Sequence, residues 1–134
     1  MIPSTNTILT TYLTIESLPG KDYKIDTERN EINGDCDELD AMAQVVYKIL
    51  NTERYQHIIY SWNYGIELQD LFGMPVYYVC PELQRRIEEA LLQDDRITSV
   101  TDFEFDTTEK RTVKATFTVN TIYGAIQSER AVNF

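Results

Sequence analysis

The sequence predicts an α+β fold with an N-terminal β-hairpin, two main helices with a short helix between them, and a C-terminal three-stranded antiparallel meander. Two observations carry this prediction. Apolar residues recur at helical spacing in two central segments, and they alternate with polar residues through most of the last third of the chain. With 134 residues, 43% of them hydrophobic and 11% aromatic, the chain can bury the core of one domain.

The first part of the chain predicts an arm followed by the hairpin. Residues 1–20 are rich in Thr and Ser and end in Leu-Pro-Gly, a turn signal, so we expect an N-terminal arm there. Short alternating runs at residues 23–26 and 31–34 flank a polar turn at residues 27–30. Residues 21–134 are expected to form a single domain that begins with this hairpin.

The first main helix is predicted over residues 36–53. Its apolar positions fall on one stripe, and charged or amide side chains lie mostly opposite. Asp35 or Asp37 can cap the start, and an acidic first turn suits the positive end of the helix dipole. The stripe consists of Leu39, Met42, Ala43, Val46, Tyr47, Ile49 and Leu50.

The segment after this helix is predicted to place aromatic side chains in the core. Residues 57–65 are aromatic and β-branched, and the run is too short for another helix. Residues 67–72 fit one or two helical turns, which Gly73 and Pro75 end.

A second main helix is predicted to begin at Pro81, because proline at the first helical position loses no intrahelical hydrogen bond. The remaining segments, residues 97–105, 111–120 and 125–134, have the pattern of strands. The apolar face of this helix consists of Leu83, Ile87, Ala90 and Leu91, and its solvated face of Arg85, Arg86, Glu88 and Glu89.

Composition excludes several classes of partner. The formal net charge is −10 and the longest basic run is Arg85-Arg86, so we expect no nucleic-acid binding. No segment approaches the ~20 apolar residues that span a bilayer, and the first residues lack the basic start of a signal peptide. We therefore expect no membrane partner, and we expect the protein to fold in the cytoplasm.

Metal and cofactor sites are not expected either. The chain has one histidine, His57, whereas His-based zinc sites need two or more such ligands. Cys36 and Cys80 lack CxxC spacing and are predicted to be reduced, partly buried thiols. A role for His57 as general base beside a cysteine nucleophile stays open as an alternative to an ordinary polar residue.

Three segments carry a resemblance to a known family. They are Leu50-Asn51-Thr52-Glu53-Arg54-Tyr55, then Tyr60-Ser61-Trp62-Asn63-Tyr64-Gly65-Ile66-Glu67-Leu68, and then Ala90-Leu91-Leu92-Gln93-Asp94-Asp95-Arg96-Ile97. From about Tyr23 to Phe134 the chain resembles the small tail proteins of PBSX-type prophages. These form a branch of the baseplate wedge proteins of contractile-tailed phages, once labelled lysozyme-like.

The resemblance implies a structural, non-enzymatic role in the baseplate of a phage or phage-like particle. Its implied partners are larger baseplate wedge proteins, the tail sheath subunit, and the tail tube or hub. Members of this family are a platform for sheath assembly, and a shared Glu-Pro-Arg motif docks onto a helical bundle of larger wedge proteins. The corresponding positions here are Asp94, Asp95 and Arg96, so the proline is lost and the arginine kept.

The resemblance makes Asp94, Asp95 and Arg96 the expected docking residues, together with Tyr64 and Gly65 from the second segment. An arginine next to carboxylates can form a bidentate pair within this chain or with a partner. The alternative is an exposed salt bridge within the chain, worth ~0–1 kcal/mol.

The last strand is the expected site of sheath attachment. A strand at the edge of a sheet can pair with a strand of another chain through backbone hydrogen bonds, and the resemblance implies strand exchange in sheath lattices. The alternative is that Phe134 only fills the core of this domain. The residues expected at this edge are Ile126, Ser128, Arg130, Val132 and Phe134.

Two other functions remain as alternatives. A glycan hydrolase of the tail would need two carboxylates facing one cleft, one of them with a raised pKa. Glu67, Asp70 and Glu82 are the acids with the most apolar sequence neighbours. A binding module unrelated to phage would share the fold but not the combined Trp62-Asn63-Tyr64-Gly65 and Arg96-Ile97 signatures.

Overall fold

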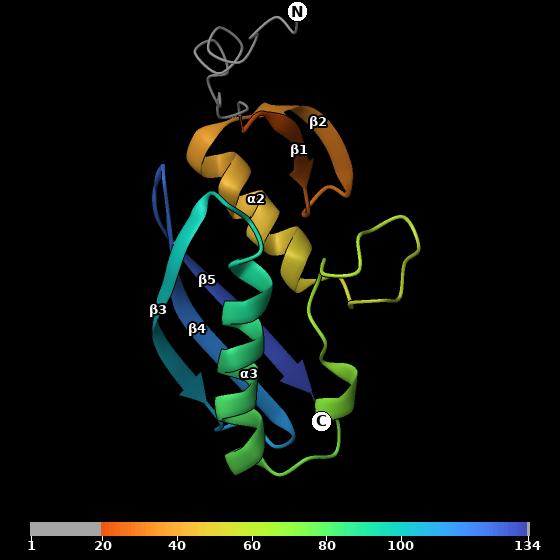
Figure 1. Ribbon diagram of the computed structural model, residues 1–134, viewed down its shortest axis with the longest axis vertical. Coiled ribbons are helices and arrows are strands. Elements are labelled where there is room, and N and C mark those ends of the chain that lie inside the picture. Colours follow the sequence, from red (N-terminus) through yellow and green to blue (C-terminus); the bar gives the residue numbers. More distant parts are fainter. Residues whose placement is uncertain (1–19, 134) are drawn as a thin grey trace, which may run out of the picture.

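The structure is a computed structural model that describes residues 20–133, so most of the expected N-terminal arm and Phe134 lie outside the described residues. The predicted α+β architecture is confirmed (Figure 1). A hairpin of β1 (Asp22–Asp26) and β2 (Glu31–Cys36) comes first. It is followed by helix α2 (Glu38–Leu50), the short helix η1 (Gln69–Leu71) and helix α3 (Val76–Leu91).

The hairpin is held against α2 by polar side chains. Gln44 Nε2 donates to the Tyr23 carbonyl at 2.6 Å, and its Oε1 accepts from the Ile25 amide at 2.9 Å. Lys48 forms an ion pair with Asp22. The sequence prediction placed Gln44 and Lys48 on a solvated face, whereas they attach the hairpin to the helix.

Helix α2 buries a narrower stripe than predicted. Asp37, one of the two residues predicted to cap the helix, is the N-cap, and its side chain accepts a hydrogen bond from the Glu38 amide. Leu39, Ala43 and Tyr47 are exposed, because neighbouring elements cover only one side of the predicted stripe. The buried residues are Ala41, Met42, Val46, Ile49 and Leu50.

Helix α3 begins at Val76, so the prediction that it starts at Pro81 is wrong. Pro75 is the N-cap, and its carbonyl accepts from the Tyr78 and Val79 amides at 3.0 and 3.1 Å. Pro81 lies inside the helix, where it removes one hydrogen bond. Val79, in the turn before Pro81, is fully buried, and the predicted face of Leu83, Ile87, Ala90 and Leu91 is confirmed as buried.

The prediction that residues 57–65 fill the core is also wrong. These residues form an exposed loop, and of their aromatic side chains Tyr64 packs against the core while Trp62 and Tyr60 are exposed. The space is filled instead by Ile66, Leu68 and Leu71, which directly follow the loop, and by the facing side chains of α3 and the sheet.

The C-terminal sheet has the order β3-β4-β5, from β3 (Ile97–Asp106), β4 (Thr112–Thr121) and β5 (Gly124–Asn133). Helices α3 and α2 cover one face, α3 over β3 and β4 and α2 over β5 (Figure 1). The alternation predicted for β4 is confirmed, since Val113, Ala115, Phe117 and Val119 are all buried against the helices.

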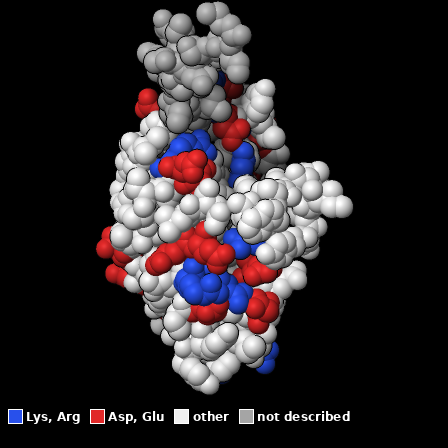
Figure 2. Space-filling view, in the orientation of Figure 1, with Lys and Arg blue, Asp and Glu red and all other residues white. Residues whose placement is uncertain are grey.

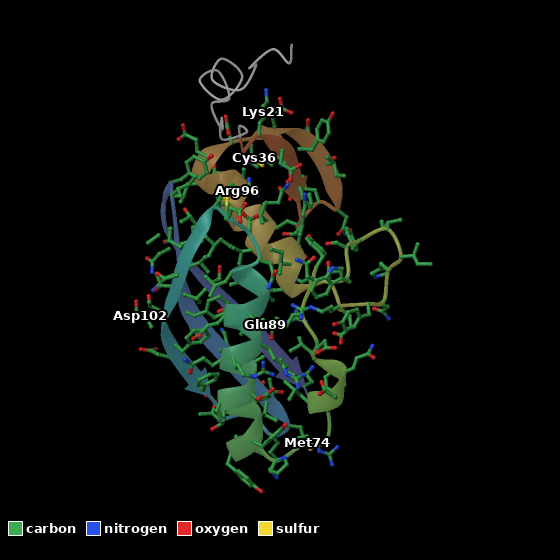
Figure 3. All side chains as sticks on the ribbon, viewed as in Figure 1. Lys21, Cys36, Met74, Glu89, Arg96 and Asp102 are labelled. Atoms are coloured by element: carbon green, nitrogen blue, oxygen red, sulfur yellow. The ribbon has the colours of Figure 1, made fainter. Side chains whose placement is uncertain are left out.

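The two outer strands of this sheet differ. The pairing of β3 with β4 shifts between Ile97 and Ser99 and again between Thr101 and Glu104. Asp102, labelled on the outer side of β3 in Figure 3, has a positive φ of 57°. In contrast, β5 pairs with β4 without irregularity from Gly124 to Asn133, so β5 is the regular edge.

Candidate functional site

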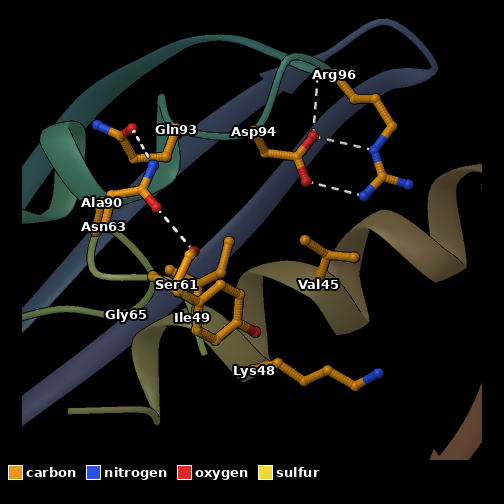
Figure 4. Close-up of a pocket in the computed structure, with 11 residues that line it drawn as sticks. Val45, Lys48, Ile49, Ser61, Asn63, Gly65, Ala90, Gln93, Asp94 and Arg96 are labelled. Atoms are coloured by element: carbon orange, nitrogen blue, oxygen red, sulfur yellow. Dashed lines mark hydrogen bonds and ion pairs between the residues drawn. The ribbon is translucent and has the colours of Figure 1, made fainter. Parts of the chain in front are cut away.

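A cleft of about 320 Å³ brings together four of the five predicted docking residues (Figure 4). Tyr64 and Gly65 enter from the loop after α2, and Asp94 and Arg96 from the turn after α3. Asp95 is exposed and does not line the cleft. The other lining residues, which the sequence prediction missed, are Val45, Lys48, Ile49, Ser61, Asn63, Ala90 and Gln93.

Arg96 and Asp94 form a bidentate ion pair on the rim of the cleft (Figure 4). Arg96 Nε donates to Asp94 Oδ1 at 3.0 Å and Nη2 donates to Oδ2 at 2.8 Å, while the Arg96 amide also donates to Oδ1 at 3.0 Å. These contacts lower the pKa of Asp94 despite its partial burial. Both side chains are partly exposed, so the pair is an internal salt bridge whose guanidinium can also reach a partner.

The opposite wall of the cleft is fixed by the base of the loop. The Ile66 amide donates to the Thr52 carbonyl at 3.0 Å, and the Arg54 amide donates to the Ile66 carbonyl at 3.1 Å. Gly65 has a φ of +91°, and a Cβ there would lie 2.5 Å from the Thr52 carbonyl oxygen. Gly65 is therefore required by the backbone, whatever it contributes to docking.

Tyr64 stands between the core and the cleft. Its ring stacks on Tyr60 with centroids 4.6 Å apart. The pKa of Tyr64 is raised, mainly by burial and to a smaller extent by the charges of Tyr60 and Asp94. The Asn63 amide group donates to Gln93 at 3.0 Å, which ties this wall of the cleft to the end of α3. Because its pKa is raised, the Tyr64 phenol is protonated at neutral pH and can donate a hydrogen bond.

Four of the five predicted edge residues lie among the described residues of β5, and their side chains point toward the helices. Ile126 packs against the core and Val132 is buried. Arg130 Nη1 donates to Asn51 Oδ1 at 2.8 Å, while Arg130 Nε is buried and has no acceptor among the described residues. Ser128 faces the same side, so these predicted edge residues direct their side chains toward the face that the helices cover, and it is the β5 backbone that can pair with another strand.

A second cleft, of about 410 Å³, runs beside this edge. It contacts four consecutive β5 residues and the exposed side of α2, and no described residue of β4 lines it. It therefore lies along the unpaired side of β5. Its lining consists of Ala43, Val46, Tyr47, Leu50, Asn51, Ser128, Glu129, Arg130 and Ala131.

Two of the three candidate acids of a hydrolase, Asp70 and Glu82, are engaged in ion pairs. Arg86 contacts both Asp70 and Glu82, and its Nη1 also donates to the Glu67 carbonyl at 2.9 Å. Arg85 and then Arg86 lower the pKa of Glu82 to about 2, and Arg86 lowers the pKa of Asp70. A general acid needs a raised pKa, so these two carboxylates are unsuited to protonate a leaving group near neutral pH.

Charges elsewhere on the described surface are mixed. On the face shown in Figure 2, Lys and Arg side chains lie next to Asp and Glu side chains and form no extended basic patch. Within residues 20–133 no three His, Cys, Asp or Glu side chains are grouped as metal ligands, and no helix is long and apolar enough to cross a membrane. His57 is exposed, and its ring contacts Tyr60 edge to face. The free thiol of Cys36 donates to Gln44 and not to His57.

Comparison with known proteins gives the family. Residues 21–124 match the family described as contractile injection system sheath initiator. The chain belongs to this family. It is also similar to the phage-like element PBSX protein XkdS of Bacillus subtilis (strain 168), with 41% identity over 114 residues that cover 82% of this chain and 80% of the relative.

Membership of the sheath initiator family confirms the resemblance inferred from the sequence and gives the chain a structural role in a contractile tail. The matched range contains the hairpin, both helices, the Arg96 cleft and the first two strands of the sheet. It ends at Gly124, where β5 begins, so the regular edge strand follows the family match.

Proposed function

We propose that this sheath initiator is a non-enzymatic baseplate component that starts sheath assembly through the edge of β5 and docks on larger wedge proteins through the Arg96 cleft. The observation that carries the proposal is the regular edge of β5. Ten consecutive residues pair with β4 without a shift, and none of the described residues pairs with the other side. Such an edge can accept a strand by backbone hydrogen bonds.

The surroundings of β5 support strand addition. The cleft along this edge is lined by exposed Tyr47 and Ala43 of α2, which can receive side chains of an added strand. The other outer strand, β3, is interrupted by two register shifts and by the positive φ of Asp102, which are typical of edges protected from pairing. The proposed partner at β5 is a strand of the tail sheath subunit.

Two proline variants test the edge. In antiparallel pairing, neighbouring residues direct their amide groups alternately toward and away from the adjacent strand, so one of Gln127→Pro and Ser128→Pro keeps the pairing with β4 intact. We expect the folded variant of the two, identified by circular dichroism and thermal unfolding, to block sheath formation. Producing cells would be examined by electron microscopy, and normal sheaths built with that variant would contradict the edge proposal.

The second proposed surface is the cleft around Arg96. The ion pair with Asp94 holds the guanidinium on the rim, next to Tyr64, whose raised pKa keeps its hydroxyl a donor. These groups can bind carboxylate or carbonyl oxygens of a helix end on a larger wedge protein. Exposed Asp95 lies beside the cleft and can contribute at its border.

Loss of co-purification with the larger wedge protein is the expected result for Arg96→Ala. The matched control is Arg85→Ala, which also removes an arginine paired with carboxylates but lies on the outer face of α3. Both variants should keep the fold, because both ion pairs are partly exposed. Equal binding of the partner by the two variants would remove Arg96 from the docking surface.

A further inference from the structure

The loop between α2 and η1 protrudes from the helices and the sheet (Figure 1), and it exposes large apolar side chains. Ile58 is 102% exposed, Ile59 84% and Trp62 76%. From Tyr55 to Tyr64 the chain has no Lys, Arg, Asp or Glu, although a quarter of all residues are charged. Such a group of exposed apolar side chains on a soluble fold marks a contact surface rather than a structural need.

The loop is held in shape at its base. Arg54 Nε donates to the Gly65 carbonyl at 3.2 Å, and Arg54 also pairs with Glu89 of α3 at 3.0 Å. The Glu53 carboxylate accepts from the amides of Leu68 and Gln69, which fixes the start of η1. The loop tip is thus presented from a preorganised support, and binding through it would cost little conformational entropy.

The shape of the loop and the charge of the chain indicate what kind of partner the loop binds. A protruding loop needs a hollow. Five clefts among residues 20–133 are each lined by at least two charged side chains, so none of these five is an apolar hollow that fits the loop of a second copy. Two chains of net charge −10 also repel each other. The same charge, with no basic residue in the loop, disfavours an anionic membrane surface.

We infer that Ile58, Ile59 and Trp62 form an anchor that inserts into an apolar pocket with a basic rim on a different protein of the tail particle. Trp is among the residues most enriched at binding hot spots, and here it is flanked by two aliphatic side chains. The anchor differs from the β5 edge and from the Arg96 ion pair, and its Trp62 lies between Ser61 and Asn63, which line the Arg96 cleft. The side chains of Ile58 and Ile59 do not line that cleft, so changing them tests the anchor apart from it.

The test is site-specific photo-crosslinking in producing cells. A benzophenone amino acid would replace Trp62, and Ile58→Ser/Ile59→Ser would be added to the same chain as a control. We expect one adduct, with a protein other than a second copy, which the two serines remove. No adduct, an adduct between two copies, or an adduct unaffected by the serines would each overturn the inference.

The affinity of the purified pair measures how much the exposed side chains of the loop contribute to binding. With the crosslinked protein purified, Ile58→Ser/Ile59→Ser should weaken binding at least ~30-fold, the scale of a hot spot. Tyr77→Ser, which removes a similarly exposed aromatic residue from the start of α3, should change it less than about twofold. Equal effects of the two changes would overturn the inference, while the proline and Arg96 tests would still decide the proposed function.

Trp62 is the single tryptophan of the chain, so its fluorescence reports on the loop in the purified protein. We expect unchanged emission and unchanged acrylamide quenching as the protein is concentrated and when vesicles of phosphatidylcholine and phosphatidylglycerol are added. A blue shift or protection from acrylamide under either condition would overturn the assignment to a different protein.

Discussion

Replacing Gly65 by alanine should destabilise the protein much more than the same change at Gly73. Both glycines have φ in the left-handed region, +91° and +83°, so each alanine is expected to cost about 1–2 kcal/mol from backbone strain alone. At Gly73 nothing lies within 4 Å of the added Cβ, whereas at Gly65 the Thr52 carbonyl oxygen lies 2.5 Å away. Only the variant at Gly65 must therefore also displace backbone.

The additional cost comes from the hydrogen bonds at the loop base. The Thr52 carbonyl accepts from the Ile66 amide at 3.0 Å, and the Ile66 carbonyl accepts from the Arg54 amide at 3.1 Å. Each is worth about 1 kcal/mol, so their weakening brings the expected loss for Gly65→Ala to about 3 kcal/mol. For a chain of this length that corresponds to a fall of roughly 10 °C in the melting temperature.

Urea unfolding of the two variants, followed by circular dichroism, measures the difference directly. We expect Gly73→Ala to lose about 1 kcal/mol and Gly65→Ala about 3 kcal/mol, with similar dependence on urea concentration. Equal losses would show that the contact with Thr52 relaxes without cost, and would refute the argument that the loop base is rigid.

Three further predictions concern pH, packing and the thiols. Because Arg85 and Arg86 lower the pKa of Glu82 from 4.5 to about 2, this pairing stabilises the fold fully above about pH 4.5 and is lost as the pH falls toward 2, so Glu82→Gln should flatten the acid limb of the unfolding free energy. A limb as steep as that of the wild type would contradict this cause. Leu83→Ala should cost about 2–5 kcal/mol in urea unfolding because Leu83 is fully buried, whereas Leu92→Ala, at an exposed site, should cost less than about 0.5 kcal/mol. Cys36 should react with a thiol reagent much more slowly in the folded protein than in urea, since it is free but buried, and equal rates would contradict its burial.

Periodic segments of the sequence predict their structure well. The alternation of Val113, Ala115, Phe117 and Val119 gives β4, and the helical spacing of Leu83 and its neighbours gives the buried face of α3, because each pattern reports burial on one side of a regular element. The start of α3 could not be predicted in this way. Proline usually marks a first turn, whereas here a helical segment that buries Val79 precedes Pro81.

Apolar character alone did not predict burial. Residues 57–62 and the side of α2 with Leu39, Ala43 and Tyr47 have the composition of core segments but lie exposed, because other residues nearer the sheet fill the available space. A local pattern contains no information about that competition. Exposed apolar segments of this kind point to contacts outside the chain.

The candidate site was predicted in part. The resemblance marks Tyr64, Gly65, Asp94 and Arg96, and the fold places all four around one cleft. No sequence pattern indicates that Lys48 and Gln93 line the same cleft, because they come from other elements and meet only through tertiary packing. Nor could it distinguish β5 from β3 as the regular edge, since register shifts leave no clear mark in these strand sequences.

The central claim is that this chain starts the sheath, and its removal tests that claim most directly. The gene would be deleted in producing cells and tails examined by electron microscopy, with the wild-type gene restored on a plasmid as control. We predict baseplates and tubes without sheaths, recovered by wild type and not by the folded proline variant of β5. Sheaths of normal length attached to baseplates in the deletion strain would contradict the account.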